Sequence, residues 1–315
     1  MTQYIIRRLI HSVIIVWGCA TLVFFLMRAI PGDPIIQMLG PEYTPEAADA
    51  LRRKLGLDEH VLIQYVQWMG DILRGDLGSS ITGAESVRSA ILSGLPKTMS
   101  IAALSFVIAT TIAVPAGILA ALKRNSFADF AVSLFAFLGV SMPSFWFGII
   151  LILVFAVNLG WLPSLGYASI SDDGLLEWFK HLILPSLAIG AGYAAILMRF
   201  VRAGLLEAMG SDYIRTARAK GLAEKRVIIG HGLRNSLIPV VTVAGIQVAL
   251  LLSGTVVIET VFAIRGIGRL LVGAIFDKDY PMVQGAILVV AVIFVFANLL
   301  VDILYTLIDP RIKYD

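Results

Sequence analysis

Six long apolar runs recur along the chain and are separated by polar segments. They extend from Leu9 to Met27, Thr98 to Leu122, Phe130 to Val157, Leu182 to Met198, Leu237 to Ile258 and Gln284 to Leu307. A helix needs roughly 20 apolar residues to cross a bilayer whose hydrocarbon core is about 30 Å thick. The pattern therefore predicts an all-α integral membrane protein with six transmembrane helices. The third run is longer than a bilayer requires, and we expect Pro143 to kink it.

Composition supports this prediction and excludes other classes. The chain is 58% hydrophobic and 15% charged, with a mean hydropathy of +0.86. Soluble domains average about 45–50% apolar and about 25% charged residues. The single cysteine, Cys19, excludes an internal disulfide, and the four histidines lack the spacing of a zinc site. The net charge of +3 is too small to indicate a nucleic-acid partner. We interpret residues 1–315 as one transmembrane domain.

Lysines and arginines indicate how the chain is oriented in the membrane. The two terminal segments, the 123–124 turn and the 199–234 loop contain 14 of them, whereas the two short loops on the opposite face contain four. Such an excess marks the cytoplasmic face. We therefore expect cytoplasmic N- and C-termini, a cytoplasmic loop at 199–234, and an extracytoplasmic segment at 31–97. No Ala-x-Ala-like site follows the first run, so we expect a span there and not a cleaved signal peptide.

The outer segment at 31–97 shows helix start and stop signals instead of long apolar runs. Thr44 is a cap for a helix that begins at Pro45 and ends at Gly56. A second helix is predicted from Asp58 to about Gly75, and a third from about Glu85 to Ser93. We expect a periplasmic helical insertion, the alternative being a solvated loop.

The basic loop at 199–234 contains a short predicted helix. Ser211 or Asp212 can cap its start, and Gly221 can end it. A helix this short is marginal in water, so we expect it to rest on a partner. Its small residues would permit close approach, and its cations would meet an acidic surface, although the positive charge alone would also follow from the membrane orientation. The residues assigned to this contact are Tyr213, Arg215, Thr216, Ala217, Arg218, Ala219, Lys220 and Gly221.

This loop resembles the cytoplasmic coupling loop of ATP-binding-cassette importer permeases, whose motif is Glu-Ala-Ala, three residues, Gly, nine residues, Ile-x-Leu-Pro. The chain matches that motif at Ala217, Gly221 and Leu233. It departs from the motif at the other specified positions, which are occupied by Arg215, Thr216, His231 and Arg234. Further segments resemble the dipeptide/oligopeptide permease family along essentially the whole chain. They include Pro31-Gly-Asp-Pro34, Asp76-Leu-Gly-Ser79, Thr216-Ala-Arg-Ala-Lys-Gly221, Glu259-Thr-Val-Phe262, Asp279-Tyr-Pro281 and Asp302-Ile-Leu-Tyr305.

The resemblance implies a type I importer permease fold in a bacterial inner membrane. It implies pairing with a second homologous permease as a heterodimer, two cytoplasmic ATPases, and an extracytoplasmic binding protein that delivers peptide. The chain is similar to the member of each pair with the longer outer segment. One departure is Arg265, which stands where the family commonly has proline, and it leaves the conformation of that loop open.

The chain lacks the residues needed to use ATP itself. It contains no Gly-x-x-x-x-Gly-Lys-[Ser/Thr] and no Gly-Lys dipeptide, so no nucleotide cradle is predicted. We therefore expect no cofactor on this chain, with ATP and Mg²⁺ bound by the partner ATPases. We assign no catalytic residue and no metal ligand.

Two sets of residues in or near the apolar runs are further candidates. Asn298, Asp302 and Tyr305 form one stripe of the last predicted helix, and we expect this stripe to hold the helix against its neighbours. The resemblance places a gate near the outer end of the fifth span, although plain exposure of Glu259 on the outer surface is the alternative. The candidate pathway or gate residues are Ser141, Pro143, Glu259 and Phe262.

Two other functions are weighed against the importer. An ion-coupled secondary transporter would need several ionisable groups near the bilayer centre, and Asp302 is the single candidate. An intramembrane serine protease would need a nucleophilic serine beside a histidine, but no Gly-x-Ser-Gly is present. The cargo stays open among peptides, opines, metal chelates and oligosaccharides.

Overall fold

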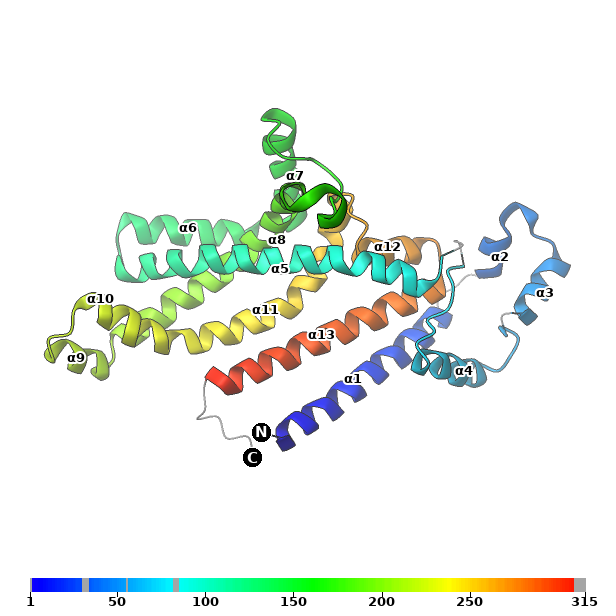
Figure 1. Cartoon of the computed structure of the whole chain (residues 1–315), viewed down its shortest axis with the longest axis horizontal. Helices are drawn as coiled ribbons and strands as arrows, with labels where there is room; N and C mark the ends of the chain where they lie inside the picture. The colour runs from blue at the N-terminus through cyan, green and yellow to red at the C-terminus, as the bar shows by residue number, and fades with distance from the viewer. Residues whose placement is uncertain (1, 30–33, 55, 82–84, 309–315) are drawn as a thin grey trace. The chain divides into compact units, whose positions relative to one another are not determined.

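The computed structural model describes residues 2–29, 34–54, 56–81 and 85–308, and most of this part is helical (Figure 1). Within these ranges, β pairing is confined to one isolated bridge between Ser79 and Ser86. The prediction of an all-α protein is confirmed. The helices pack as two compact units: unit 1 is Met1–Lys97 with Arg265–Phe296, and unit 2 is Thr98–Ile264 with Ala297–Asp315.

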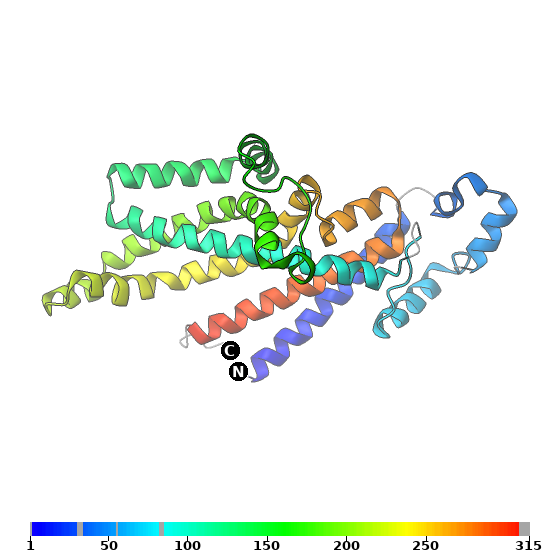
Figure 2. The ribbon, with the colours of Figure 1, turned by 45° about the horizontal axis from the view of Figure 1, so that its top comes forward.

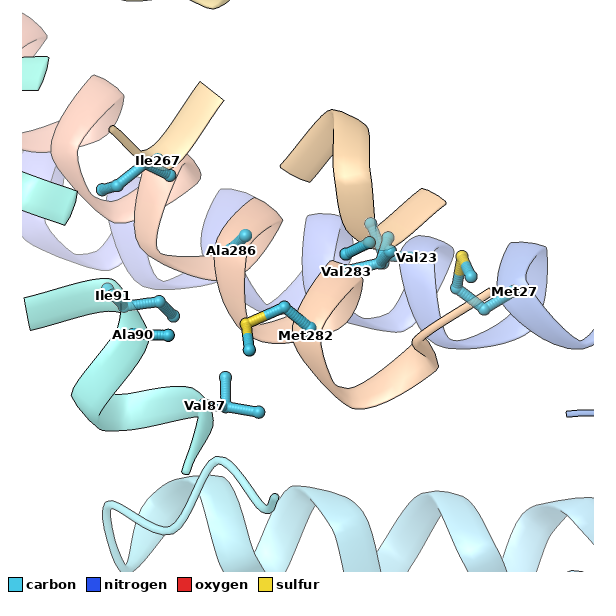
Figure 3. Packing of buried hydrophobic residues seen from close by; sticks show 10 residues of the cluster. Val23, Met27, Val87, Ala90, Ile91, Ile267, Met282, Val283 and Ala286 are labelled. Atoms are coloured by element: carbon cyan, nitrogen blue, oxygen red, sulfur yellow. The ribbon is translucent and has the colours of Figure 1, made fainter. Parts of the chain in front are cut away.

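Unit 1 is built around four helix segments with a shared apolar core. Figure 3 shows Val87 and Ile91 facing Met282, while Val23 lies beside Val283. The elements of this unit are α1 (Thr2–Ala29), α2 (Pro34–Leu39), the 3₁₀ helix η1 (Gly40–Glu42), α3 (Pro45–Lys54), α4 (Val61–Leu73), the start of α5 (Val87–Leu122), α12 (Ile267–Phe276) and the start of α13 (Tyr280–Ile308).

A carboxylate joins two segments of unit 1 that are far apart in sequence. Oδ1 of Asp279 accepts a hydrogen bond from the backbone N–H of Met282 at 3.1 Å and so caps the first turn of α13. Oδ2 accepts from the Ser80 hydroxyl and, at 3.1 Å, from the backbone N–H of Ile81. Asp279 therefore joins the start of α13 to the residues directly after the recurring segment 76–79. That segment also lies near 279–281, because a Cβ at Gly78 would be 3.8 Å from the side chain of Pro281.

The short helices of unit 1 confirm part of the sequence prediction. The Thr44 hydroxyl accepts from the backbone N–H of Ala47 at 3.2 Å, as expected of the cap of α3. The next helix, α4, begins later than the predicted Asp58, because His60 caps it by accepting from Leu62 at 3.3 Å. The sequence analysis missed α2 and η1.

The third predicted helix of the outer segment was wrong as a separate element. It is the beginning of α5, which starts at Val87 and continues without a break to Leu122. The predicted end at Ser93 is not observed, because the next residue, Gly94, lies within α5. Gly94 permits close approach: a Cβ there would lie 3.1 Å from the carbonyl carbon of Gly266, so a larger residue would push these two backbones apart by a few tenths of an ångström.

Unit 2 is organised around α8 (Ile170–Met209), which packs against α6 (Phe127–Ser141), α7 (Ser144–Leu151) and α11 (Arg234–Val261). Figure 2 shows α8 and α11 converging at the end that carries the shortest helices. The packing of α5 on α8 is tight, because a Cβ at Gly117 would lie 2.8 Å from the carbonyl oxygen of Met198. The remaining elements are the π-helix η2 (Ile152–Asn158), α9 (Asp212–Ala219), α10 (Glu224–Arg226), the π-helix η3 (Val227–Leu233) and the ends of α5 and α13.

The candidate membrane spans agree with the predicted number when two bent helix pairs are each counted as one span. The pair on either side of Pro143 is bent by 107° and the pair on either side of Pro239 by 50°. Proline cannot donate the helical hydrogen bond, which explains why the breaks fall there. The expected kink at Pro143 is confirmed. The long spans are Ile6–Ala29, Val87–Leu122, Ile170–Met209 and Tyr280–Val301, and the bent pairs are Phe127–Ser141 with Ser144–Asn158 and Glu224–Leu237 with Pro239–Val248.

Candidate functional site

The short helix predicted in the basic loop is α9, and its position agrees with the prediction to within one residue at either end. Ser211 has the extended backbone of a cap, but its hydroxyl donates to the carbonyl oxygen of Ala208 and caps no N–H of α9. The helix ends where Gly221 adopts a φ of +75° and its N–H donates to the carbonyl oxygen of Arg218 at 2.9 Å. Glycine reaches this left-handed conformation without steric cost, so it is the residue best suited to this end.

Apolar side chains of its own chain support α9 from beneath. Ile214 and Ala217 are buried with Val227 of η3, and Met209 and Leu222 pack around them. This corrects one expectation: Ala217 faces the core of its own chain, so it does not offer a surface to a partner. The cluster instead fixes α9 to the end of α8 and to η3.

The opposite face of α9 is exposed. Tyr213, Thr216, Ala219 and Lys220 lie on it, and the Thr216 hydroxyl donates back to the carbonyl oxygen of Asp212 at 3.0 Å. Figure 1 shows α9 at the tip of unit 2, at the end of α8. A solvent-facing helix on a buried support is suited to contact another protein.

The cations of α9 are arranged differently from the prediction. Arg218 forms a two-pronged ion pair with Glu224, with Nη2 to Oε1 at 2.6 Å and Nε to Oε2 at 3.1 Å. The hydrogen bond that Arg218 donates to this carboxylate raises the pKa of the arginine. Arg215 pairs with Asp212 at 3.3 Å, and both of these side chains are largely exposed. Arg218 therefore joins α9 to α10 within the same loop. The cations of this helix that remain for an outside contact are Lys220 and the weakly paired Arg215.

A second group of candidate residues lies in the core of unit 2. Glu259 is fully buried near the end of α11, where the Thr98 hydroxyl donates to its Oε1 at 2.6 Å. The alternative of an exposed Glu259 is wrong. Phe262 is also buried, and its carbonyl oxygen accepts from the N–H of Gly166 at 2.8 Å. A buried carboxylate requires such donors, because without them its desolvation would be costly.

The four candidate gate residues do not share one surface. Ser141 and Pro143 are exposed at the break between α6 and α7, whereas Glu259 and Phe262 are buried. The aromatic ring of Phe262 nevertheless connects the two regions, because a Cβ at Gly148 of α7 would lie 3.1 Å from it. The packing of α7 on α11 thus depends on a glycine.

The predicted polar stripe is described only in part. Asn298 is half-buried on α13. Asp302 and Tyr305 belong to the same helix, but their side chains lie outside the described part of the structure.

The sequence analysis missed an ion pair between α6 and α8. Arg202 donates through Nε to Oδ1 of Asp129 at 2.7 Å and through Nη2 to Oδ2 at 2.9 Å. Oδ2 also accepts from the backbone N–H of Asn125 at 3.0 Å. The signal available in the sequence was an aspartate three residues after Ser126 and directly before an apolar run, because an unpaired charge would be costly there. Among the described residues, no group of three or more His, Cys, Asp or Glu side chains is placed to hold a metal ion.

Comparison with known families accounts for both parts of the chain. Residues 113–314 match the family described as the binding-protein-dependent transport system inner membrane component, and residues 1–102 match the N-terminal membrane component of the same kind of system. The chain belongs to this family. It is therefore a multi-pass protein of the bacterial inner membrane and the membrane component of an ATP-binding-cassette importer, a permease and not an enzyme.

Full-length relatives and solved structures agree with this assignment. The chain is 39% identical over 316 residues to the oligopeptide transport system permease protein AppB of Bacillus subtilis, with all of both chains covered. It is 42% identical over 335 residues to the di/tripeptide transport system permease protein DppB of Pseudomonas aeruginosa, with 100% of this chain and 99% of that protein covered. A chain of the inward-facing MetNI methionine ABC transporter has the same fold, with a TM-score of 0.57, 21% identity, and coverage of 70% of this chain and 97% of that chain.

Proposed function

We propose that this permease imports peptides as one of two homologous permease subunits, with an extracytoplasmic binding protein that delivers the peptide and two cytoplasmic ATPases that supply the energy. The observation that carries the choice of peptide is the full-length similarity to permeases named for oligopeptides and for di- and tripeptides. ATP and Mg²⁺ are bound by the ATPases in this proposal, because the chain has no phosphate-binding loop.

In this proposal α9 is the element that the ATPases move. Its exposed face supplies the contact, and its buried face transmits force because Ile214 and Ala217 lock it against Val227. The chain leads from α9 through α10 and η3 into α11, and Glu259 lies near the far end of that helix. A displacement of α9 would therefore act on α8 and α11 together. Transport requires that ATP-bound and ATP-free partners make different contacts with α9.

In this scheme Glu259 and Phe262 support the gate from within the protein and do not contact the cargo. Both are buried, and the hydrogen bond from Thr98 ties the outer end of α11 to α5. Ser141 and Pro143, at the exposed break after α6, are the candidates for contact with the cargo.

Transport in proteoliposomes tests the proposal. The chain is reconstituted with its companion permease, ATPases and binding protein, and uptake of a labelled tripeptide is measured. We expect uptake that requires ATP and the binding protein and that persists when an ionophore collapses ion gradients. An ATPase variant unable to hydrolyse ATP is the control. Uptake that continues without ATP, and stops when the gradient collapses, would instead support an ion-coupled transporter.

Labelling of intact cells tests the proposed orientation. In a background with Cys19→Ser, a membrane-impermeant maleimide should label His60→Cys and should label Lys220→Cys only after the cells are opened. Labelling of position 220 in intact cells, with none at position 60, would reverse the orientation.

A further inference from the structure

The helix α4 in unit 1 has a face that docks on α1. The Tyr65 hydroxyl lies 2.7 Å from the Thr21 hydroxyl, and the guanidinium of Arg28 donates to the side-chain oxygen of Gln64 at 2.7 Å. The rings of Phe24 and Trp68 have centroids 5.1 Å apart. These contacts hold α4 beside the last two turns of α1.

A second face of α4 is apolar and exposed. Leu62, Val66 and Leu73 form one helical stripe, and they are 58%, 68% and 81% exposed. No residue of α4 is buried. The helix also has a polar side, on which Gln67 and Asp71 lie. An exposed apolar stripe opposite charged and amide groups is typical of a helix that lies in a membrane interface.

The depth of the contact with α1 indicates what covers this stripe. Thr21 lies eight residues before Ala29, the end of the span Ile6–Ala29, which places it about 12 Å from that end. A contact at that depth is inside the hydrocarbon core and not in the aqueous phase. Next to it, Leu22 and Leu26 of α1 are themselves exposed. The apolar stripe of α4 is therefore close to the lipid-facing surface of a membrane span.

From this placement we infer that α4 is a membrane-interface helix whose Leu62–Val66–Leu73 stripe contacts the acyl chains of the leaflet in which α1 ends. With 13 residues, α4 is about 20 Å long and too short to cross the bilayer. Residues 61–70 contain no charge. Tyr65 and Trp68 are the residue types enriched at the membrane–water boundary. Part of the outer segment is thereby anchored to lipid, which limits how far it can move during transport.

Spin labels on α4 test this inference in the assembled transporter. With Cys19→Ser as background, nitroxide labels are placed at Val66→Cys and Leu73→Cys, with Gln67→Cys and Asp71→Cys as matched controls on the polar side of the same helix. The complex is reconstituted in phosphatidylglycerol/phosphatidylethanolamine vesicles. Collisions with oxygen, which concentrates in lipid, are compared with collisions with a water-soluble nickel chelate.

We expect labels at positions 66 and 73 to favour oxygen over the nickel chelate by several-fold more than labels at 67 and 71. Equal exposure of all four labels to the nickel chelate would overturn the inference, because α4 would then face water. Protection of positions 66 and 73 from both reagents would also overturn it, because a protein would then cover the stripe. Two positions on each side ensure that one poorly folded variant does not decide the result.

Discussion

Replacement of Gly221 is predicted to uncouple the transporter through backbone conformation alone. Gly221 has a φ of +75°, and an added Cβ would meet no heavy atom within 4 Å. A side chain therefore creates no clash, and its whole effect is the cost of the left-handed conformation, about 1–2 kcal/mol for a non-glycine residue. For Gly221→Val, this cost should shift the equilibrium at the C-terminal end of α9 from the folded turn toward an unwound one by about 5- to 30-fold. Gly221→Asn is the matched control, because asparagine tolerates this conformation.

The assay compares ATPase activity of the reconstituted complex with and without the loaded binding protein. We expect the valine variant to lose most of the stimulation and the asparagine variant to keep most of it. Both should insert into the membrane at wild-type levels, because the buried Ile214–Val227 support of α9 is untouched. Wild-type stimulation and wild-type transport in the valine variant, at equal insertion, would refute the reasoning.

Three further predictions concern packing and buried polar contacts, each measured by thermal unfolding of the purified complex. Gly117→Ala places a Cβ 2.7 Å from the side chain of Val201 and should lower the free energy of unfolding by about 1–3 kcal/mol. Gly18→Ala, which has open space around it, should leave the stability unchanged. Equal melting temperatures for the two variants would contradict this. Thr98→Val removes a donor to a buried carboxylate and should lower the free energy of unfolding by about 1–3 kcal/mol. Thr98→Ser keeps the hydroxyl and should be close to wild type. Similar losses of stability in both variants would assign the effect to packing. Asp129→Asn should destabilise more on its own than in combination with replacement of its arginine partner by methionine, and additive losses would contradict a coupled pair.

The sequence predicted the helices that follow from long apolar runs or from strong end signals. The six runs correspond to four continuous spans and two bent ones, although the second bent pair, Glu224–Leu237 with Pro239–Val248, begins before the predicted Leu237 and ends before the predicted Ile258. The helix α9 was found from a cap, a glycine and the basic residues between them, and α3 was found from Thr44 and the following proline. These signals are local, so no knowledge of packing is needed to interpret them.

Features that depend on packing were missed or misinterpreted. The helix predicted to end near Ser93 continues, because Gly94 lies within α5 and permits close approach to Gly266. Ala217 was assigned to the partner-facing surface, because an eight-residue helix with one large apolar residue does not reveal which side is buried. The pairing of Arg218 with Glu224 spans six residues and depends on the turn at Gly221.

Contacts between distant segments were also beyond the sequence pattern. Thr98 and Glu259 are 161 positions apart, and Asp129 and Arg202 are 73 apart. No residue of these pairs identifies its partner by itself, since a threonine or a charged residue near a span end has many possible partners. Burial of the carboxylates makes the pairings understandable, and burial is known only from the fold.

Photocrosslinking from α9 provides the decisive test of its role. A benzophenone amino acid replaces exposed Tyr213 in the complete transporter, and the same group at exposed Leu165, in the loop before α8, serves as the control. We predict an adduct between position 213 and an ATPase subunit whose yield changes when ATP is bound, and none from position 165. Absence of an ATPase adduct from position 213, in a complex that still transports peptide, would contradict the proposal that this helix receives the motion of the ATPases.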